Sequence, residues 1–103
     1  TRASVLRKYL ADNGFEVTEE RAVWDGEFAY SVMKCRYTGV TYEISDVREQ
    51  TGLTDASYED GRKYIEKQLE RMKKAADGMR NSRPAEAEKI DMTMENIRKE
   101  KGI

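Results

Sequence analysis

The sequence contains no histidine and only one cysteine, Cys35, among its 103 residues. Without histidine the chain lacks the commonest general base and the commonest metal ligand, and a single cysteine cannot complete a zinc site. One cysteine also excludes an internal disulfide, which favours a reducing compartment. No apolar run reaches the ~20 residues of a membrane-spanning helix, and no signal-peptide pattern is visible. We therefore expect a cytoplasmic protein without a metal site.

Net charge is also small, at −1, although 38% of the residues are charged. This balance argues against a strongly basic nucleic-acid arm or an acidic tail. The charges are unevenly spread, because residues 62–83 hold eight Lys or Arg against three Asp or Glu. Residues 84–96 reverse the balance, with four acidic residues against one lysine. A chain of this length has room for one small domain.

The first half of the chain predicts a short helix followed by a β-hairpin. A helix is expected over residues 3–13, ended by Gly14, with four apolar residues on one face: Val5, Leu6, Tyr9 and Leu10. A strand should follow over residues 15–24, with three apolar residues on one face: Phe15, Val17 and Val23. Asp25-Gly26 predicts a type I′ hairpin turn. The returning strand, residues 27–38, is apolar on both faces, so we expect it to be covered on both sides.

A connecting segment separates this hairpin from the rest of the chain. Val40, Tyr42 and Ile44 alternate with polar residues, which predicts a short third strand or an extended connector. Ser45 is a candidate N-cap for a short helix that runs to Gln50 and ends at Gly52.

The second half, residues 54–103, predicts an antiparallel two-helix hairpin with coiled-coil spacing. The first helix should start at Thr54 or Ser57, the latter with Asp60 as a capping-box variant. Apolar residues then recur at heptad spacing, first at Tyr58, Ile65, Leu69, Met72, Ala76 and Met79, and after a turn near Gly78 to Pro84 at Ala87, Ile90, Met94 and Ile97. The expected fold is therefore α+β, with residues 1–53 as the helix and β-hairpin unit and residues 54–103 as the helical hairpin.

One face of the first long helix is a candidate nucleic-acid interface. Four cations at helical spacing project from one side, where they can follow a phosphate backbone: Lys63, Lys67, Arg71 and Lys74. The alternative is a solvated surface with two pairs at i, i+4, Glu59–Lys63 and Glu70–Lys74.

Residues 42–58 also fit a helix-turn-helix pattern, with Thr51-Gly52-Leu53 as the turn. That motif needs a small residue where Arg48 falls, because its two helices cross closely there. Three acidic residues would face phosphates on the supposed recognition helix: Asp55, Glu59 and Asp60. DNA binding of this kind is a further alternative.

The remaining single residues favour packing over chemistry. Cys35 has no histidine partner and is expected to be a small core residue. Trp24, beside the tight turn, either caps the core or stacks on a base, and packing is the default. Glu19 and Glu20 are expected at an exposed strand end and form no recognisable carboxylate dyad, and no glycine-rich phosphate loop is present. The chain therefore carries no catalytic or cofactor motif of its own.

The order helix, Gly-Phe, strand, Asp-Gly turn and strand resembles the last part of a class I S-adenosylmethionine-dependent methyltransferase domain. Four stretches resemble the bacterial tRNA adenine-N1 methyltransferases in particular: Leu6-Arg7-Lys8-Tyr9-Leu10, Asn13-Gly14-Phe15-Glu16-Val17, Glu19-Glu20 and Tyr30-Ser31-Val32-Met33. Those enzymes carry a helical, coiled-coil-like C-terminal extension, which corresponds to residues 54–101.

This resemblance implies that residues 1–53 end a Rossmann-like sheet and that the cofactor loop and catalytic motif lie before Thr1. S-adenosylmethionine is then the cofactor of the full-length protein, and this chain binds none. The implied partner is tRNA, which the hairpin's basic face would position. An alternative without nucleic acid is a small helical-hairpin module for protein interaction or self-association.

Overall fold

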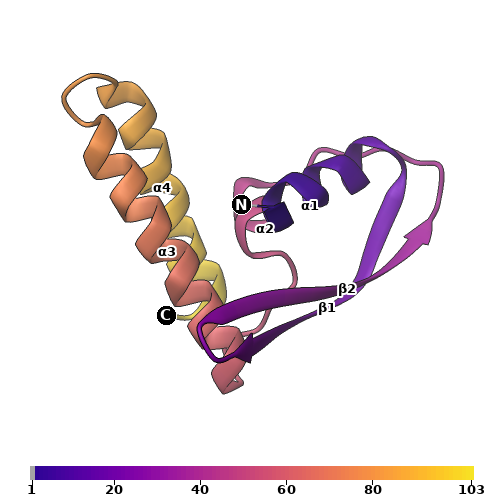
Figure 1. Cartoon of the computed structure of the whole chain (residues 1–103). Coiled ribbons are helices and arrows are strands. Elements are labelled where there is room, and N and C mark those ends of the chain that lie inside the picture. Colours follow the sequence, from indigo (N-terminus) through magenta and orange to yellow (C-terminus); the bar gives the residue numbers. More distant parts are fainter. Residues whose placement is uncertain (1) are drawn as a thin grey trace.

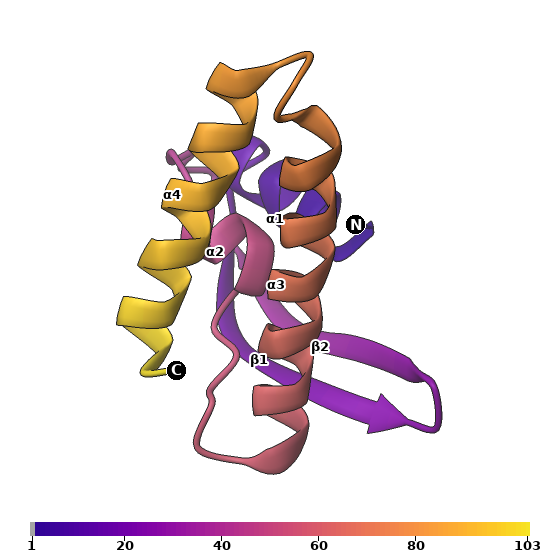
Figure 2. The same ribbon diagram turned by 90° about the vertical axis from the view of Figure 1, so that its left-hand side faces the viewer.

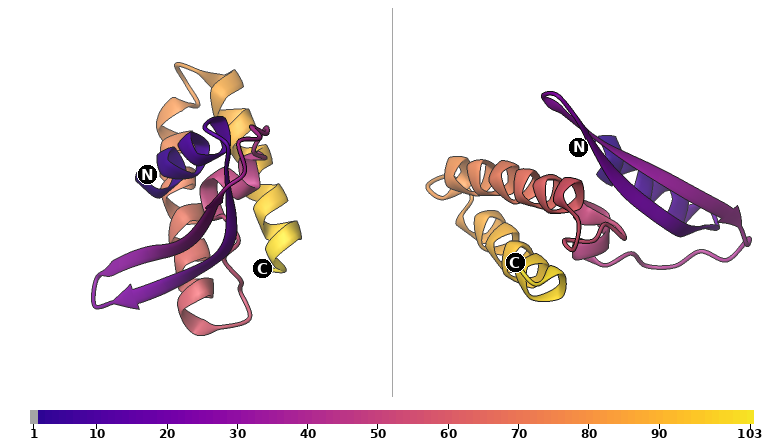
Figure 3. Two further views of the ribbon diagram at one scale, coloured as in Figure 1. Left: turned by 90° about the vertical axis from the view of Figure 1, so that its right-hand side faces the viewer. Right: turned by 90° about the horizontal axis from the view of Figure 1, so that it is seen from below.

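The computed structural model of the chain describes residues 2–103 and has an α+β fold (Figure 1). Its elements in chain order are α1 (Arg2–Asp12), β1 (Phe15–Asp25), β2 (Phe28–Tyr37), α2 (Asp46–Thr51), α3 (Glu59–Met79) and α4 (Pro84–Lys101). Among residues 2–103, β1 and β2 form a two-stranded antiparallel sheet. Helix α1 lies along this ribbon, α3 and α4 stand beside each other as a helical hairpin, and α2 lies between the two parts (Figure 3).

A β-bulge between Val17 and Glu19 changes which side of β1 faces the core. The bulge adds a residue to one strand, so the inward side moves from odd-numbered to even-numbered residues. Val17 and Ala22 are both buried as a result, whereas Val23 is 39% exposed. The expectation that Val17 and Val23 share one face was wrong for this reason.

The hairpin turn lies one residue later than the sequence pattern predicts. Asp25 pairs with Phe28, so Gly26 and Glu27 are the two loop residues. Gly26 has a φ of +59°, and no residue other than glycine has a positive φ among the described residues. A positive φ at the first loop position alone fits a type II′ turn rather than type I′.

The side of helix α1 that is buried differs from the side that its apolar residues predict. Its buried residues are Ser4, Arg7, Leu10 and Ala11. Val5, Leu6 and Tyr9 are exposed, Val5 by 68%. Arg7 has hydrogen-bonding partners on β1, β2, α2 and α3, so its polar contacts help to orient this helix together with the burial of Leu10 and Ala11.

Strand β2 is not covered on both faces, contrary to expectation. Phe28, Tyr30 and Val32 are each more than half exposed. Cys35, expected in the core, is exposed as well. The reason is that α1 and α3 contact one side of the ribbon only, and the outer edge of β2 pairs with no other strand among residues 2–103.

The segment after β2 forms an extended connector rather than a third strand. Gly39 donates its N–H to the Gly14 carbonyl, which keeps the connector beside the end of α1. The prediction for α2 is confirmed, because the Ser45 hydroxyl accepts a hydrogen bond from the Arg48 N–H and Gly52 caps the other end with a φ of +61°.

Helix α3 begins at Glu59, later than predicted, and its N-cap Tyr58 makes no side-chain capping bond. Ser57 does not cap it, and its N–H bonds instead to the Asp55 carboxylate at 2.8 Å. The Asp60 carboxylate accepts the Trp24 N–H at 3.2 Å, and the Tyr58 hydroxyl accepts the Ala22 N–H at 2.7 Å. The first turn of α3 therefore covers the outer edge of β1 instead of closing a capping box.

Helices α3 and α4 run side by side in opposite directions, joined by a short turn before Pro84 (Figure 2). Arg80 fixes this end of the pair, because its guanidinium bonds Asp91 of α4 at 2.7 and 3.1 Å. The main core collects the apolar stripe of both helices with one residue from β1 and one from α2: Ala22, Val47, Tyr64, Ile65, Leu69, Met94 and Ile97. Residues on both sides of position 53 thus share this core. In the part of the chain described here, no helix is both long and apolar enough to span a membrane.

Candidate nucleic-acid interface

The four cations of α3 differ in how far they are engaged by the chain itself. Lys63 pairs with Glu59 at 3.2 Å and Lys74 with Glu70 at 3.8 Å, as the i, i+4 spacing predicts. Both pairs are exposed, and such surface pairs contribute little. Lys67 and Arg71 make no ion pair with any of residues 2–103. Two of the four cations are therefore free to meet an anion without losing a carboxylate partner.

Trp24 lies against this face of α3 rather than in the core. The Nζ atoms of Lys63 and Lys67 lie 5.8 and 5.6 Å from the centroid of its ring. Both distances suit a cation–π contact. The tryptophan is only half-buried, so its ring extends the basic surface with an aromatic plane. The sequence pattern predicts that Trp24 caps the core or stacks on a base, and it does not predict this contact with two lysines.

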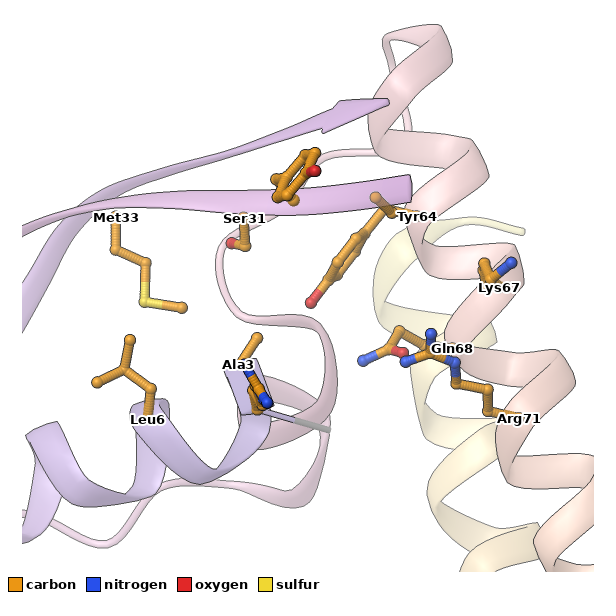
Figure 4. Close-up of a pocket in the computed structure, with 11 residues that line it drawn as sticks. Ala3, Leu6, Ser31, Met33, Tyr64, Lys67, Gln68 and Arg71 are labelled. Atoms are coloured by element: carbon orange, nitrogen blue, oxygen red, sulfur yellow. The ribbon is translucent and has the colours of Figure 1, made fainter. Parts of the chain in front are cut away.

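A cavity of about 530 Å³ opens between α1, β2 and α3, beside Lys67 and Arg71 (Figure 4). Arg2 of α1 also lines it, so the cavity has three cations around it. Its other lining residues are apolar or neutral: Ala3, Leu6, Ala29, Tyr30, Ser31, Met33, Tyr64 and Gln68. The volume falls within the range of small-molecule sites.

The wall of this cavity is held by a buried ion pair between Arg7 and Glu20, whose side chains are each only 1% exposed. Arg7 Nη2 lies 2.6 Å from the carboxylate of Glu20 and 2.7 Å from the hydroxyl oxygen of Tyr64. Ser31 donates to the same carboxylate. Since Ser31 and Tyr64 line the cavity, this network fixes their positions.

The same network joins further elements of the fold. Arg7 Nη1 donates to the carbonyl of Glu49 in α2 at 3.0 Å, and Glu20 accepts the N–H of Leu53 at 3.2 Å. Every polar atom of the ion pair thus has a partner, which a buried charge requires.

Sequence reasoning missed Arg7, and it treated Glu20 as part of an exposed strand end. Arg7 lies one helical turn before Leu10 and Ala11, on the face of α1 that is buried. A charged residue in such a stripe, with an acidic residue on the next strand, is the signal that could have found the pair. It is weak, because long cations usually extend from the edge of an apolar face to water.

The helix-turn-helix pattern corresponds to different geometry in the structure. Helix α2 has only six residues, and seven residues separate its end at Thr51 from the start of α3 at Glu59. The motif has a turn of three or four residues. The N-terminal turn of α3, which would enter the DNA groove, contacts β1 through Tyr58 and Asp60. Arg48 is half-buried, and its Nε has no hydrogen-bond partner among the described residues. These observations give the DNA-binding alternative no support.

Comparisons of the chain with protein-family models, with curated proteins and with solved structures found no match in any of the three.

Proposed function

We propose that this chain is the C-terminal part of an S-adenosylmethionine-dependent tRNA adenine-N1 methyltransferase, and that α3 positions tRNA through its basic face. The observation that carries the RNA-binding half of this proposal is the pair Lys67 and Arg71. Both cations lack an ion-pair partner within residues 2–103 and line the cavity, and Lys67 also lies over the Trp24 ring. Backbone phosphates are the anions that such a spaced pair suits.

The exposed side of β2 supports the methyltransferase half of the proposal, in which the chain is part of a larger domain. Phe28, Tyr30 and Val32 present apolar side chains to solvent, and the outer edge of β2 is unpaired among residues 2–103. A free apolar edge strand promotes aggregation unless it is covered. A further strand of a Rossmann-like sheet would pair with the free edge of β2, and a further helix would cover its exposed apolar side chains. In this proposal that part also binds S-adenosylmethionine and supplies the catalytic residues, and the helical hairpin is a coiled-coil extension.

Titration of the chain with tRNA at two salt concentrations tests the RNA-binding half. We expect binding at low salt that weakens steeply as salt rises, because phosphate contacts release counterions. Absence of binding, or binding that salt leaves unchanged, would contradict the proposal. The methyltransferase half is tested separately, by assaying the complete gene product for transfer of a methyl group from S-adenosylmethionine to adenine N1 of tRNA. No transfer by the complete product would contradict it.

Self-association is the second candidate function, and the same exposed apolar residues favour it. The heptad stripe cannot mediate it, because Ile65, Leu69 and Ile97 are already buried within the chain. Two copies would instead meet through the apolar surface of α1 and β2. Sedimentation at two protein concentrations distinguishes this function from RNA positioning, since it predicts concentration-dependent mass in the absence of RNA.

A further inference from the structure

We propose that the cavity between α1, β2 and α3 binds one unpaired nucleotide of RNA. Its phosphate would lie on the cations, and its base between Leu6 and Met33. The inference rests on the proposed function, because it names a second contact that the same RNA makes beyond the phosphate backbone. The cavity is divided along its length into a cationic end, a polar middle and an apolar end, and a nucleotide has the same three parts in the same order.

The cationic end is formed by two side chains of α3. Lys67 and Arg71 lie one turn apart on that helix, and Arg2, from the first turn of α1, also lines the cavity. Figure 4 shows Lys67 and Arg71 on the side of the cavity away from Leu6 and Met33. Arginine donates two parallel hydrogen bonds to phosphate oxygens, and lysine acts as a point charge. Because neither Lys67 nor Arg71 makes an ion pair within residues 2–103, both can turn to one phosphate.

The apolar end lies between one residue of α1 and one of β2. Leu6 and Met33 point toward each other across the gap between these elements (Figure 4). Leu6 is 46% exposed and Met33 is partly exposed, so neither is consumed by packing within the chain. A polarisable methionine sulfur makes favourable contacts with aromatic rings. This end therefore suits a flat, uncharged ring, which distinguishes a nucleotide from a free phosphate.

The polar middle offers hydrogen bonds to a sugar. Arg7 can only donate, so the Tyr64 oxygen is the acceptor of their 2.7 Å bond, and the Tyr64 hydroxyl hydrogen can be donated to a ligand. Gln68 donates its amide N–H to the carbonyl of Gln50 at 2.9 Å, which directs its amide oxygen to accept from another group. A donor and an acceptor in fixed positions match the hydroxyl groups of ribose, which mark RNA among nucleic acids.

Titration with adenosine monophosphate, followed by the methyl signals of the methionines, tests this inference in the full chain. We expect the Met33 methyl signal to shift with adenosine monophosphate and to stay unchanged with inorganic phosphate at the same concentration. Met92, which is exposed on α4, is the internal control and should not shift with either. A Met33 signal that adenosine monophosphate leaves unchanged, or equal affinity for the nucleotide and inorganic phosphate, would overturn the inference.

A matched pair of variants on α1 separates loss of binding in the cavity from a general effect of the substitution on folding. Leu6→Asp places a carboxylate in the apolar end, whereas Val5→Asp makes the same change on a neighbouring residue that does not line the cavity. Both residues are exposed, so both variants should fold. We expect Leu6→Asp to weaken binding of adenosine monophosphate by about tenfold or more, and Val5→Asp to bind as the wild type does.

Titration of both variants with tRNA separates the inference from the proposed function. Salt-dependent tRNA binding that is equal in Leu6→Asp and Val5→Asp would overturn the nucleotide site and leave RNA positioning by α3 intact. Loss of tRNA affinity in Leu6→Asp alone would support the nucleotide site. If the wild type binds adenosine monophosphate at Met33 but no tRNA, the proposed function fails while the cavity remains a nucleotide site.

Discussion

At the scale of single residues, the Arg7–Glu20 pair joins five elements of the fold. The pair itself joins α1 to β1, its hydrogen-bond partners come from β2, α2 and α3, and its two side chains are almost wholly buried. Taking two charges out of water is costly, and the mutual attraction of a buried pair only roughly offsets that cost. The pair therefore contributes less to net stability than to fixing one arrangement, because any other packing leaves a buried charge alone.

Replacing Arg7 by methionine should lower the free energy of unfolding by about 3–5 kcal/mol, because Glu20 is then buried without its partner. Urea denaturation measures this change. The matched control is Arg36→Met, which breaks the exposed Arg36–Glu16 pair and should cost about 1 kcal/mol or less. The double variant Arg7→Met/Glu20→Gln should recover part of the loss, since no buried charge remains. A loss in Arg7→Met no larger than in Arg36→Met would show that the pair is not buried.

The thiol of Cys35 should ionise at a higher pH in the folded chain than in the unfolded one. Desolvation raises its pKa first, and the negative charge of Glu20 raises that pKa further. At a pH between the ordinary and the raised value, the folded chain therefore retains the proton and reacts slowly with alkylating reagents. The rate of alkylation by iodoacetamide, followed across pH, should have its midpoint above that of the urea-unfolded chain. An equal or lower midpoint would contradict this prediction.

At the scale of elements, the N-terminal turn of α3 is where the helical hairpin joins the ribbon. Gly61 lies in this turn, and an added Cβ there would come within 1.9 Å of the Asp55 carbonyl oxygen and 2.6 Å of the Tyr58 ring. The glycine allows this close approach, which positions Tyr58 to bond β1. From the sequence alone, Gly61 only weakens the helix relative to alanine. In the structure, the close contacts with Asp55 and Tyr58 explain why a glycine occupies this position.

Gly61→Ala should therefore destabilise the protein by about 1–3 kcal/mol, the usual cost of inserting an atom into packed surroundings. Gly78→Ala on the same helix should have the opposite sign and stabilise by up to about 1 kcal/mol. Its Cβ would meet no atom within 4 Å, and its φ is not positive. Thermal and urea unfolding of the two variants measure both changes. Stabilisation by both would contradict the close contact at Gly61.

At the scale of the whole molecule, a chain with a net charge of −1 carries an excess of five positive charges over residues 62–83, most of α3 and the turn that follows it. Most cations outside the cavity are held by carboxylates of the same chain, as Lys73 is by Asp77 and Lys99 is by Glu95. Attraction of a polyanion then depends on a local surface rather than on total charge. Lys67 and Arg71 belong to that surface.

The salt dependence of tRNA binding should report this local surface. Replacing Lys67 and Arg71 together by glutamine should lower the slope of log affinity against log salt by about 2, roughly one for each phosphate that the variant no longer neutralises. The control Lys73→Gln/Lys99→Gln removes the same charge from ion-paired positions and should leave the slope nearly unchanged. Fluorescence anisotropy with labelled tRNA gives both slopes. Equal slopes in the two double variants would assign the attraction to total charge instead.

The sequence by itself determined the elements whose signals are local. The β-hairpin, the Ser45-capped helix and the two long helices with their buried apolar stripe follow from periodicity, caps and turn residues between near neighbours. The positions of the four candidate cations on one side of α3 follow in the same way. The fold class was predictable because these local preferences agree with one another.

Tertiary structure alone decided which faces are inside and which groups meet. The bulge in β1 reversed the side of Val23, and the partners of Arg7 buried a charged face of α1 in place of Val5 and Leu6. The cavity beside Lys67 likewise joins residues from α1, β2 and α3 that lie far apart in the chain. Periodicity reports the character of each face but not the neighbour it meets, and burial depends on the free energy of contacts between distant segments.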